Sequence, residues 1–195
     1  MNVNMVLFDD FEAMDVCGPA EIFGKLQQYF HVRYLSVSGD VVNSVQGTKI
    51  WTDFLVPDEI DGILLIPGGK GARRLLWQDE RTLHIIKKSA ENAETCMMVG
   101  SGSAIMAQTG LLYRRKMADC SVDKNWNRMF TAGIDRIPGA KVVADGKYYS
   151  CKDTFSSLEM TLWMIADLID IDAAIDAAQQ IGYNWDGTGG DEIFC

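Results

Sequence analysis

Four short apolar runs, separated by segments with helical periodicity, constrain the fold of this chain more than any other feature. Runs of Val, Ile, Leu and Met without alternation are typical of parallel strands buried on both faces. Helices between them are expected to begin near Asp15, near Gly71, at about Asp79 and at Ser101. The pattern predicts an α/β protein with a parallel sheet that helices cover on both sides. The four runs are NVNMVLF at 2–8, HVRYLSVS at 31–38, GILLIP at 62–67 and TCMMVG at 95–100.

The rest of the chain fits the same single domain, 1–195. Alternating residues in DVVNSVQGTKIWTDF predict a hairpin with its turn near Gln46-Gly47, and AKVVADGKYYSC predicts a weak strand pair with a turn at Asp145-Gly146. No internal repeat, linker or low-complexity block interrupts the pattern. Further helices are predicted at about 124–130, 156–170 and 172–181.

Composition excludes several classes of protein. A net charge of -9 works against nucleic acid binding, because phosphate contacts need clustered Lys and Arg. No apolar run approaches the roughly 18 residues that a membrane span needs, and the first residues lack the features of a secretion signal. The five cysteines are an odd number without C-x-x-C spacing, so reduced thiols and a cytoplasmic location are expected.

The segment ETCMMVGSGSAIMAQTGLL at 94–112 reads as a strand, a sharp turn and a helix. Such turns hold phosphates or catalytic nucleophiles in α/β proteins. A dinucleotide cradle is disfavoured because Ile105 stands where the third glycine of G-x-G-x-x-G belongs. A serine hydrolase is disfavoured because G-x-S-x-G is out of frame and the only histidines, His31 and His84, lie at a strand start and in a helix.

Four blocks of the sequence, in this order, resemble the ThiJ/PfpI superfamily over about residues 2–182, and the nearest branch is the isocyanide hydratase-like one. The superfamily shares its fold with class I glutamine amidotransferases and includes intracellular proteases, deglycases and isocyanide hydratases. The resemblance implies a flavodoxin-like three-layer sandwich with a mostly parallel central sheet and a strand-turn-helix nucleophile elbow. The blocks are VLFDDFEAMDVCGPAEIF at 6–23, DGILLIPGGKGARRLL at 61–76, VGSGSAIMAQTGLL at 99–112 and SCKDTFSSLEMTLWMIADL at 150–168.

The resemblance also implies a site. Asp15 matches the family's acid, and Gly68 and Gly69 match the glycine pair whose backbone amides face the site. Ser101 matches the small hydroxyl residue after the nucleophile, and its amide is assigned to the oxyanion together with those of the glycine pair. Backbone amides at such a turn can stabilise an oxyanion without any side chain. Relatives read V-C-x-G-[SA] at the elbow, whereas this chain reads V-G-S-G-S, which places Gly100 at the position of the catalytic cysteine.

Glycine suits this position once the thiol is not required. The elbow residue is held at an uncommon φ, often positive, which costs a residue with a β-carbon about 1–3 kcal/mol. Cys120 stands where relatives often carry histidine, and Cys17 lies one turn from Asp15, so both are possible relocated thiols.

Each of these assignments has a simpler structural alternative. Asp15 is equally well explained as the N-cap of the first helix. Cys17 is better explained as a small residue packed beneath the elbow. Cys96, on a buried strand, is expected to be a packing residue.

Two functions remain open at the level of the sequence. One is a pseudoenzyme, a small-molecule-binding or regulatory module with a pocket at the C-terminal edge of the sheet. The other is a cysteine-type protease, amidase or isocyanide hydratase-like enzyme whose cysteine was replaced at Gly100, or one that uses Asp15 as a general base. The resemblance implies a homodimer, and neither a cofactor nor a metal is expected.

Overall fold

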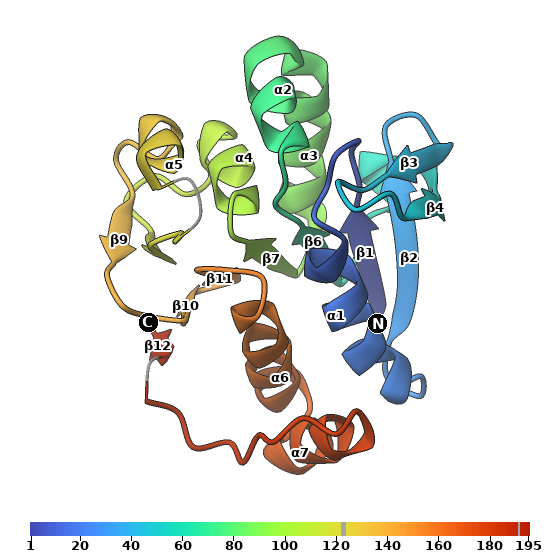
Figure 1. Cartoon of the computed structure of the whole chain (residues 1–195), viewed down its shortest axis with the longest axis vertical. Helices are drawn as coiled ribbons and strands as arrows, with labels where there is room; N and C mark the ends of the chain where they lie inside the picture. The colour runs from blue at the N-terminus through green and yellow to red at the C-terminus, as the bar shows by residue number, and fades with distance from the viewer. Residues whose placement is uncertain (122–123, 191) are drawn as a thin grey trace.

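The computed structural model describes residues 1–121, 124–190 and 192–195, and it has three layers, with helices on both faces of a central sheet (Figure 1). The sheet has the order β12-β10-β11-β7-β6-β1-β2-β5. Every pair in it is parallel except β10 with β11. The mostly parallel sandwich predicted from the sequence is therefore confirmed. The sheet strands are β1 (Asn2–Val6), β2 (His31–Ser36), β5 (Asp53–Phe54), β6 (Ile63–Ile66), β7 (Thr95–Val99), β10 (Val142–Asp145), β11 (Tyr148–Cys151) and β12 (Glu192–Phe194).

Two small strand pairs and a set of helices complete the fold. The predicted hairpin is present as β3 (Val41–Asn43) and β4 (Lys49–Trp51), and β8 (Lys116–Ala118) pairs with β9 (Asp135–Ile137) in parallel. The helices are α1 (Ala13–Lys25), α2 (Gly71–Gln78), α3 (Glu80–Asn92), α4 (Gly102–Gln108), α5 (Lys124–Phe130), α6 (Ser156–Leu168) and α7 (Ile171–Gln180), with a 3-10 turn η1 (Pro57–Glu59). No helix in the described part of the chain is long and apolar enough to cross a membrane.

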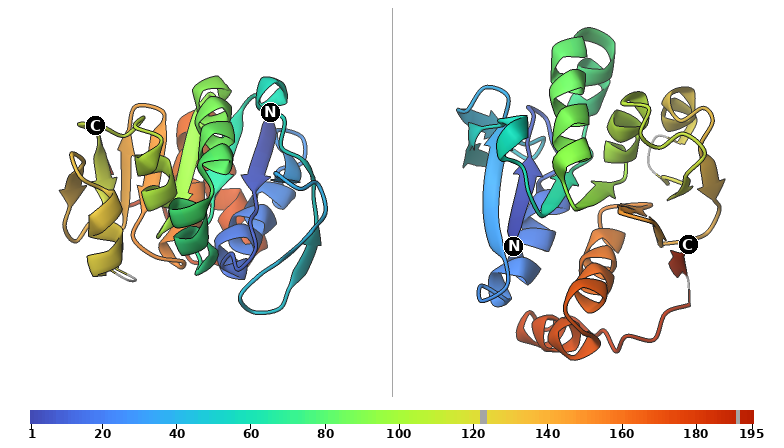
Figure 2. Two further views of the ribbon diagram at one scale, coloured as in Figure 1. Left: turned by 90° about the horizontal axis from the view of Figure 1, so that it is seen from above. Right: turned by 180° about the vertical axis from the view of Figure 1, so that it is seen from behind.

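Burial of the central strands on both faces explains why they read as continuous apolar runs. In β6, Ile63 and Leu65 belong to the core beneath α1, α6 and α7, while Leu64 and Ile66 belong to the core beneath α2, α3 and α4. Alternate residues of a strand point to opposite faces, so a strand covered on both sides needs an apolar residue at every position. Figure 2 shows the two helical layers from above and from behind.

The order of the strands determines where a site can form. The chain passes from β1 to β2 on one side, and later returns to β6 on the other side of β1. A reversal of this kind opens a crevice at the carboxyl ends of the strands, where α/β proteins usually bind ligands. The first turn of α1 and the loops after β6 and β7 meet at this edge, and they carry the acid, the glycine pair and the elbow predicted from the sequence.

Candidate functional site

The elbow between β7 and α4 is built as the sequence predicts. Gly100 is buried and has φ +49°, a left-handed conformation that favours glycine. Its amide donates to the carbonyl of Cys151 at 3.1 Å, and its carbonyl accepts the hydroxyl of Ser103 at 2.5 Å. Gly102 is needed for a different reason, because a β-carbon there would lie 2.3 Å from the carbonyl oxygen of Ile66. One glycine therefore allows the turn, and the other allows α4 to approach the end of β6.

Asp15 is a buried acid of the site and does not cap the first helix. The N-cap of α1 is Glu12, and Asp15 lies in the first turn with an exposed fraction of 2%. Its Oδ2 accepts the amide of Gly68 at 2.8 Å, while Oδ1 is buried without a well-formed hydrogen bond among the described residues. The N-cap alternative is thus wrong, because the side chain points toward the neighbouring loop instead of its own helix.

Burial changes the acidity of Asp15. Loss of hydration raises its pKa to about 6, contacts with the Thr154 hydroxyl and the Gly68 amide oppose this rise, and the charges of Glu12 and Asp153 add to it. A carboxyl group with this pKa exchanges a proton readily near neutral pH.

Gly68 and Gly69 bring the acid and the elbow together. A β-carbon on Gly68 would lie 2.9 Å from Asp15 Oδ2 and 2.9 Å from Ser101 Oγ, so both side chains converge on this glycine. The amide of Gly69 donates to Ser101 Oγ at 3.0 Å. A β-carbon on Gly69 would lie 2.4 Å from the carbonyl oxygen of Asp10, which requires glycine here too. Two of the three amides assigned to an oxyanion, those of Gly68 and Gly69, are therefore already bonded to side chains of the site.

The cysteines separate into two environments. Cys120 follows β8, is buried, and its Sγ lies 3.8 Å from the position that a β-carbon on Gly100 would occupy. Cys17 is exposed on α1 beside Tyr34, and burial of part of the side chain raises the pKa of its thiol. The expectation that Cys17 packs beneath the elbow is wrong, because its side chain is exposed. Cys96 is fully buried on β7, as expected of a packing residue.

Two further residues of the site were not singled out from the sequence. Cys151, at the end of β11, is buried, and burial followed by the charge of Asp15 raises the pKa of its thiol well above the usual value. Thr154 lies in the next loop and contacts Asp15. Both belong to the fourth block of the resemblance, SCKDTF, but nothing in local sequence indicates that the loop after β11 returns to α1.

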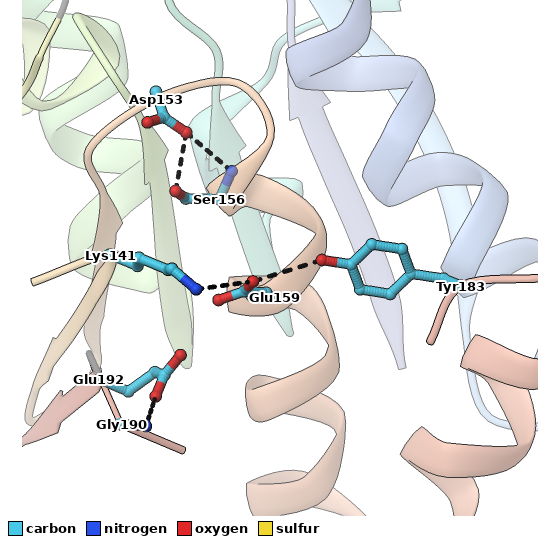
Figure 3. A network of polar contacts seen from close by, with 7 residues as sticks. All are labelled: Lys141, Asp153, Ser156, Glu159, Tyr183, Gly190 and Glu192. Carbon is cyan, nitrogen blue, oxygen red and sulfur yellow. Dashed lines mark hydrogen bonds and ion pairs between the residues drawn. The ribbon is translucent and has the colours of Figure 1, made fainter. Parts of the chain in front are cut away.

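Polar contacts hold this loop and the nearby tail in place (Figure 3). Asp153 Oδ1 accepts the amide of Ser156 at 2.9 Å and its hydroxyl at 2.7 Å, which fixes the start of α6. One turn further along α6, Glu159 Oε1 accepts from Lys141 Nζ and from the Tyr183 hydroxyl, each at 3.3 Å. The bonds between Asp153 and Ser156 orient the loop that carries Thr154.

The structure supports neither a serine-histidine pair nor a metal site at the elbow among the described residues. His31 and His84 are both exposed, on β2 and α3, so neither pairs with Ser101. Within the described residues, no group of three or more His, Cys, Asp or Glu is arranged to hold a metal ion. A cavity of about 470 Å³ does lie at the carboxyl edge of the sheet, at the ends of β1 and β2, but none of the predicted site residues line it.

Comparison with known proteins covers nearly the whole chain. The model of the DJ-1/PfpI family matches residues 1–167. An isonitrile hydratase from Pseudomonas putida is 24% identical over 190 residues, which cover 94% of this chain and 78% of that protein.

Solved structures agree with this match. A ThiJ/PfpI family protein from Pseudomonas syringae superposes with a TM-score of 0.83 at 26% identity, over 97% of this chain and 77% of the other. DJ-1beta from Drosophila melanogaster superposes with a TM-score of 0.81 at 13% identity, over 94% and 98% of the two chains, which shows a shared fold.

Proposed function

Because the chain belongs to the DJ-1/PfpI family, we propose that it is a small-molecule-binding member of this family that lacks the catalytic nucleophile. The observation that carries the proposal is Gly100, which occupies the tip of the elbow at φ +49° with no side chain to react. The acid, the glycine pair and the hydroxyl around the elbow are retained. The protein then acts as a pseudoenzyme, a binding or regulatory module.

The hydrogen bonds of the glycine pair support binding over catalysis. An oxyanion hole needs donors that are preorganised and free to meet developing charge. Here the amide of Gly68 donates to Asp15 and that of Gly69 donates to Ser101. A developing oxyanion would have to replace these internal acceptors, so the two amides would stabilise it less than unengaged amides would.

Asp15 gives the proposed ligand site its chemical character. With a pKa of about 6, the carboxyl is partly protonated near neutral pH and can both donate to and accept from a ligand. Its Oδ1 has no well-formed hydrogen bond among the described residues. The site is therefore suited to a small polar ligand that satisfies this oxygen.

A second candidate function is a cysteine-dependent enzyme, a protease, an amidase or an isonitrile hydratase, whose cysteine was replaced at Gly100. One observation favours it: within the described part of the chain, and apart from the adjacent residues, the one atom within 4 Å of a β-carbon at Gly100 is Cys120 Sγ, at 3.8 Å, so a β-carbon meets no steric clash there. The P. putida relative is itself an isonitrile hydratase. A relocated thiol at Cys120 is a variant of this candidate.

Two properties beyond the site are part of the proposal. We keep the homodimer implied by the family resemblance, and two exposed apolar side chains support it, Trp51 of the β3-β4 hairpin at 69% and Phe54 of the edge strand β5 at 64%. A cytoplasmic location is supported by the five cysteines, all of which are free thiols.

The test uses cyclohexyl isocyanide as the probe. Hydration adds water across the isocyanide carbon and nitrogen and yields N-cyclohexylformamide, which proton NMR detects directly. The proposal expects chemical-shift changes near Asp15 on titration and no formamide from the natural chain. Gly100→Cys is expected to produce formamide, and Gly139→Cys, the same change at another left-handed glycine with open space around it, is not.

Formamide production by the unsubstituted chain would contradict the pseudoenzyme, and two variants would then identify the group responsible. Formamide production by the natural chain that Asp15→Asn abolishes would replace the pseudoenzyme by an enzyme that uses Asp15 as its base. Production that Cys120→Ser abolishes would assign the reaction to the relocated thiol.

A further inference from the structure

The cavity at the ends of β1 and β2 lies on the α2 and α3 side of the sheet and is partly open to solvent. It has a volume of about 470 Å³, within the range of small-molecule sites. Its walls come from the end of β1, the end of β2, β3 and the two helices, elements that lie side by side in Figure 1.

Two crossing segments of backbone separate this cavity from the elbow. The amide of Glu12 donates to the carbonyl of Gly68 at 2.9 Å, and the amide of Gly71 donates to the carbonyl of Asp10 at 3.1 Å. The loop after β1 is thereby bonded to the loop after β6, between the elbow and the cavity. No residue of the elbow site lines the cavity, so a molecule bound in the cavity need not contact the elbow.

The inner walls of the cavity are apolar. Val6, Leu75 and Ile86 are buried members of the core on this face, and Val42 of β3 closes the space from the hairpin side. Contact with such walls favours an aliphatic or aromatic body, since burial of apolar surface is the main non-directional contribution to binding.

The acidic side chains around the cavity are engaged with donors of the protein itself. Both oxygens of Asp79 bond to Thr82, Oδ1 to its amide at 2.8 Å and Oδ2 to its hydroxyl. Asp9 Oδ1 accepts the amide of Asn43 at 3.1 Å. These contacts orient the carboxylates toward the backbone of α3 and β3, and so reduce their repulsion of an anionic ligand.

Arg74 is the cation at the wall of the cavity, and its contacts are weak. Its Nη1 lies 3.4 Å from Asp10 Oδ2, its Nη2 lies 3.3 Å from the carbonyl oxygen of Asp9, and its side chain is 54% exposed. Both distances are longer than typical charge-assisted hydrogen bonds of about 2.7–2.9 Å. The planar guanidinium has five N–H donors in a geometry that matches a carboxylate, and these two contacts leave donors for a ligand.

We propose that this cavity binds a small monocarboxylate, with its aliphatic or aromatic body against the apolar walls and its carboxylate on Arg74. The site is independent of the elbow and of the function proposed for it. A ligand of this class satisfies both features of the cavity, because one end is apolar and the other end is a single planar anion.

Octanoate and 1-octanol form a matched pair of probes that differ in the charged end. Titrations followed by amide chemical shifts are expected to show octanoate binding at least about fivefold more tightly than octanol, with changes at Ser36, Val42 and Thr82. Arg74→Gln is expected to weaken octanoate about tenfold, equivalent to roughly 1.4 kcal/mol, and to leave octanol unchanged. Arg73→Gln is the control, since Arg73 is on the same helix but stacks on Trp126 and does not line the cavity.

A second variant tests the location without removing a charge. Val41 lines the cavity and is 40% exposed, so Val41→Trp is expected to obstruct the space, leave the melting temperature nearly unchanged and weaken both probes. Asp15→Asn is expected to affect neither probe, which keeps this test distinct from that of the elbow. The proposal is overturned if neither probe binds at millimolar concentration, if Arg74→Gln leaves the octanoate preference intact, or if the chemical-shift changes centre on Asp15 and Gly100.

Discussion

A β-carbon on Gly100 would lie 3.8 Å from Cys120 Sγ, so the space at the tip of the elbow faces a buried thiol from a different part of the chain. This geometry brings together the two positions at which the family resemblance predicts a departure from the usual residues, a cysteine at 100 and a histidine at 120. Substitutions at Gly100 can therefore test the elbow directly, because an added β-carbon would meet no close contact and would have Cys120 Sγ as its neighbour.

Gly100→Ala is expected to destabilise the protein by about 1 kcal/mol or more, because φ +49° is strained for a residue with a β-carbon. Urea unfolding measures the change. Gly24→Ala is the control, since Gly24 lies in α1 without a positive φ, and outside its own helix no atom of the described residues lies within 4 Å of an added β-carbon. There the same substitution is expected to be neutral or stabilising. An increase in stability for Gly100→Ala would show that residue 100 does not adopt the left-handed conformation.

Gly100→Cys is expected to place a thiol of lowered pKa at the N-terminus of α4, where backbone amides favour the thiolate. At pH 7 this thiol should be oxidised by peroxide to the sulfenic acid, with release of water, faster than Cys17 or Cys195. Peptide mass mapping follows the modification. Gly139→Cys provides an exposed thiol of ordinary reactivity for comparison.

When Asp15 is ionised, it opposes the lowering of the thiol pKa in Gly100→Cys, because a carboxylate beside a thiolate raises the pKa of the thiol. Asp15→Asn in the Gly100→Cys background is therefore expected to lower the thiol pKa further. If the thiol at position 100 titrates near 8.5 in both backgrounds, position 100 is not the catalytic position of the family.

Asp15 should make the stability of the protein depend on pH. Its pKa is raised from 3.8 to about 6 in the folded state, so between these values the folded protein keeps a proton that the unfolded chain has lost. The contribution of Asp15 to stability is therefore full below about pH 4 and is lost as the pH rises through 6. A tenfold change in an acid dissociation constant corresponds to about 1.4 kcal/mol, which makes the loss roughly 3 kcal/mol.

The matched measurement compares the natural chain with Asp15→Asn at pH 4 and pH 7. The free energy of unfolding of the variant, relative to that of the natural chain, is expected to rise by roughly 2.5 kcal/mol between these two values, slightly less than the full loss because the unfolded chain is already partly ionised at pH 4. A constant difference across this range would mean that Asp15 titrates as it does in water.

Iodoacetamide should separate the five cysteines by exposure. Cys17 and Cys195 are exposed and are expected to be labelled first, while the three buried thiols are expected to react only on unfolding. Cys17 should react more slowly than Cys195, because burial of part of its side chain raises its pKa. Rapid labelling of Cys120 in the folded protein would show an open path to the elbow and favour the relocated thiol. The buried thiols are Cys96, Cys120 and Cys151.

The sequence by itself determined the elements whose signals are local. The apolar runs of the central strands, the left-handed glycine at position 100 and the turn at Asp145-Gly146 each follow from the conformational and burial preferences of neighbouring residues. Short pieces such as β8 and β9 were not predicted, because three residues carry too little periodicity to distinguish a strand from a loop.

Only the tertiary structure decided which side chains meet. Local sequence allowed Asp15 to cap α1, but the bond to Gly68 joins residues 53 positions apart and takes the side chain away from the helix. The outward position of Cys17, the approach of Cys120 to Gly100 and the separation of the Arg74 cavity from the elbow depend in the same way on how the loops pack. Periodicity specifies which face of an element is buried, whereas contacts between loops depend on the positions of all the strands that carry them.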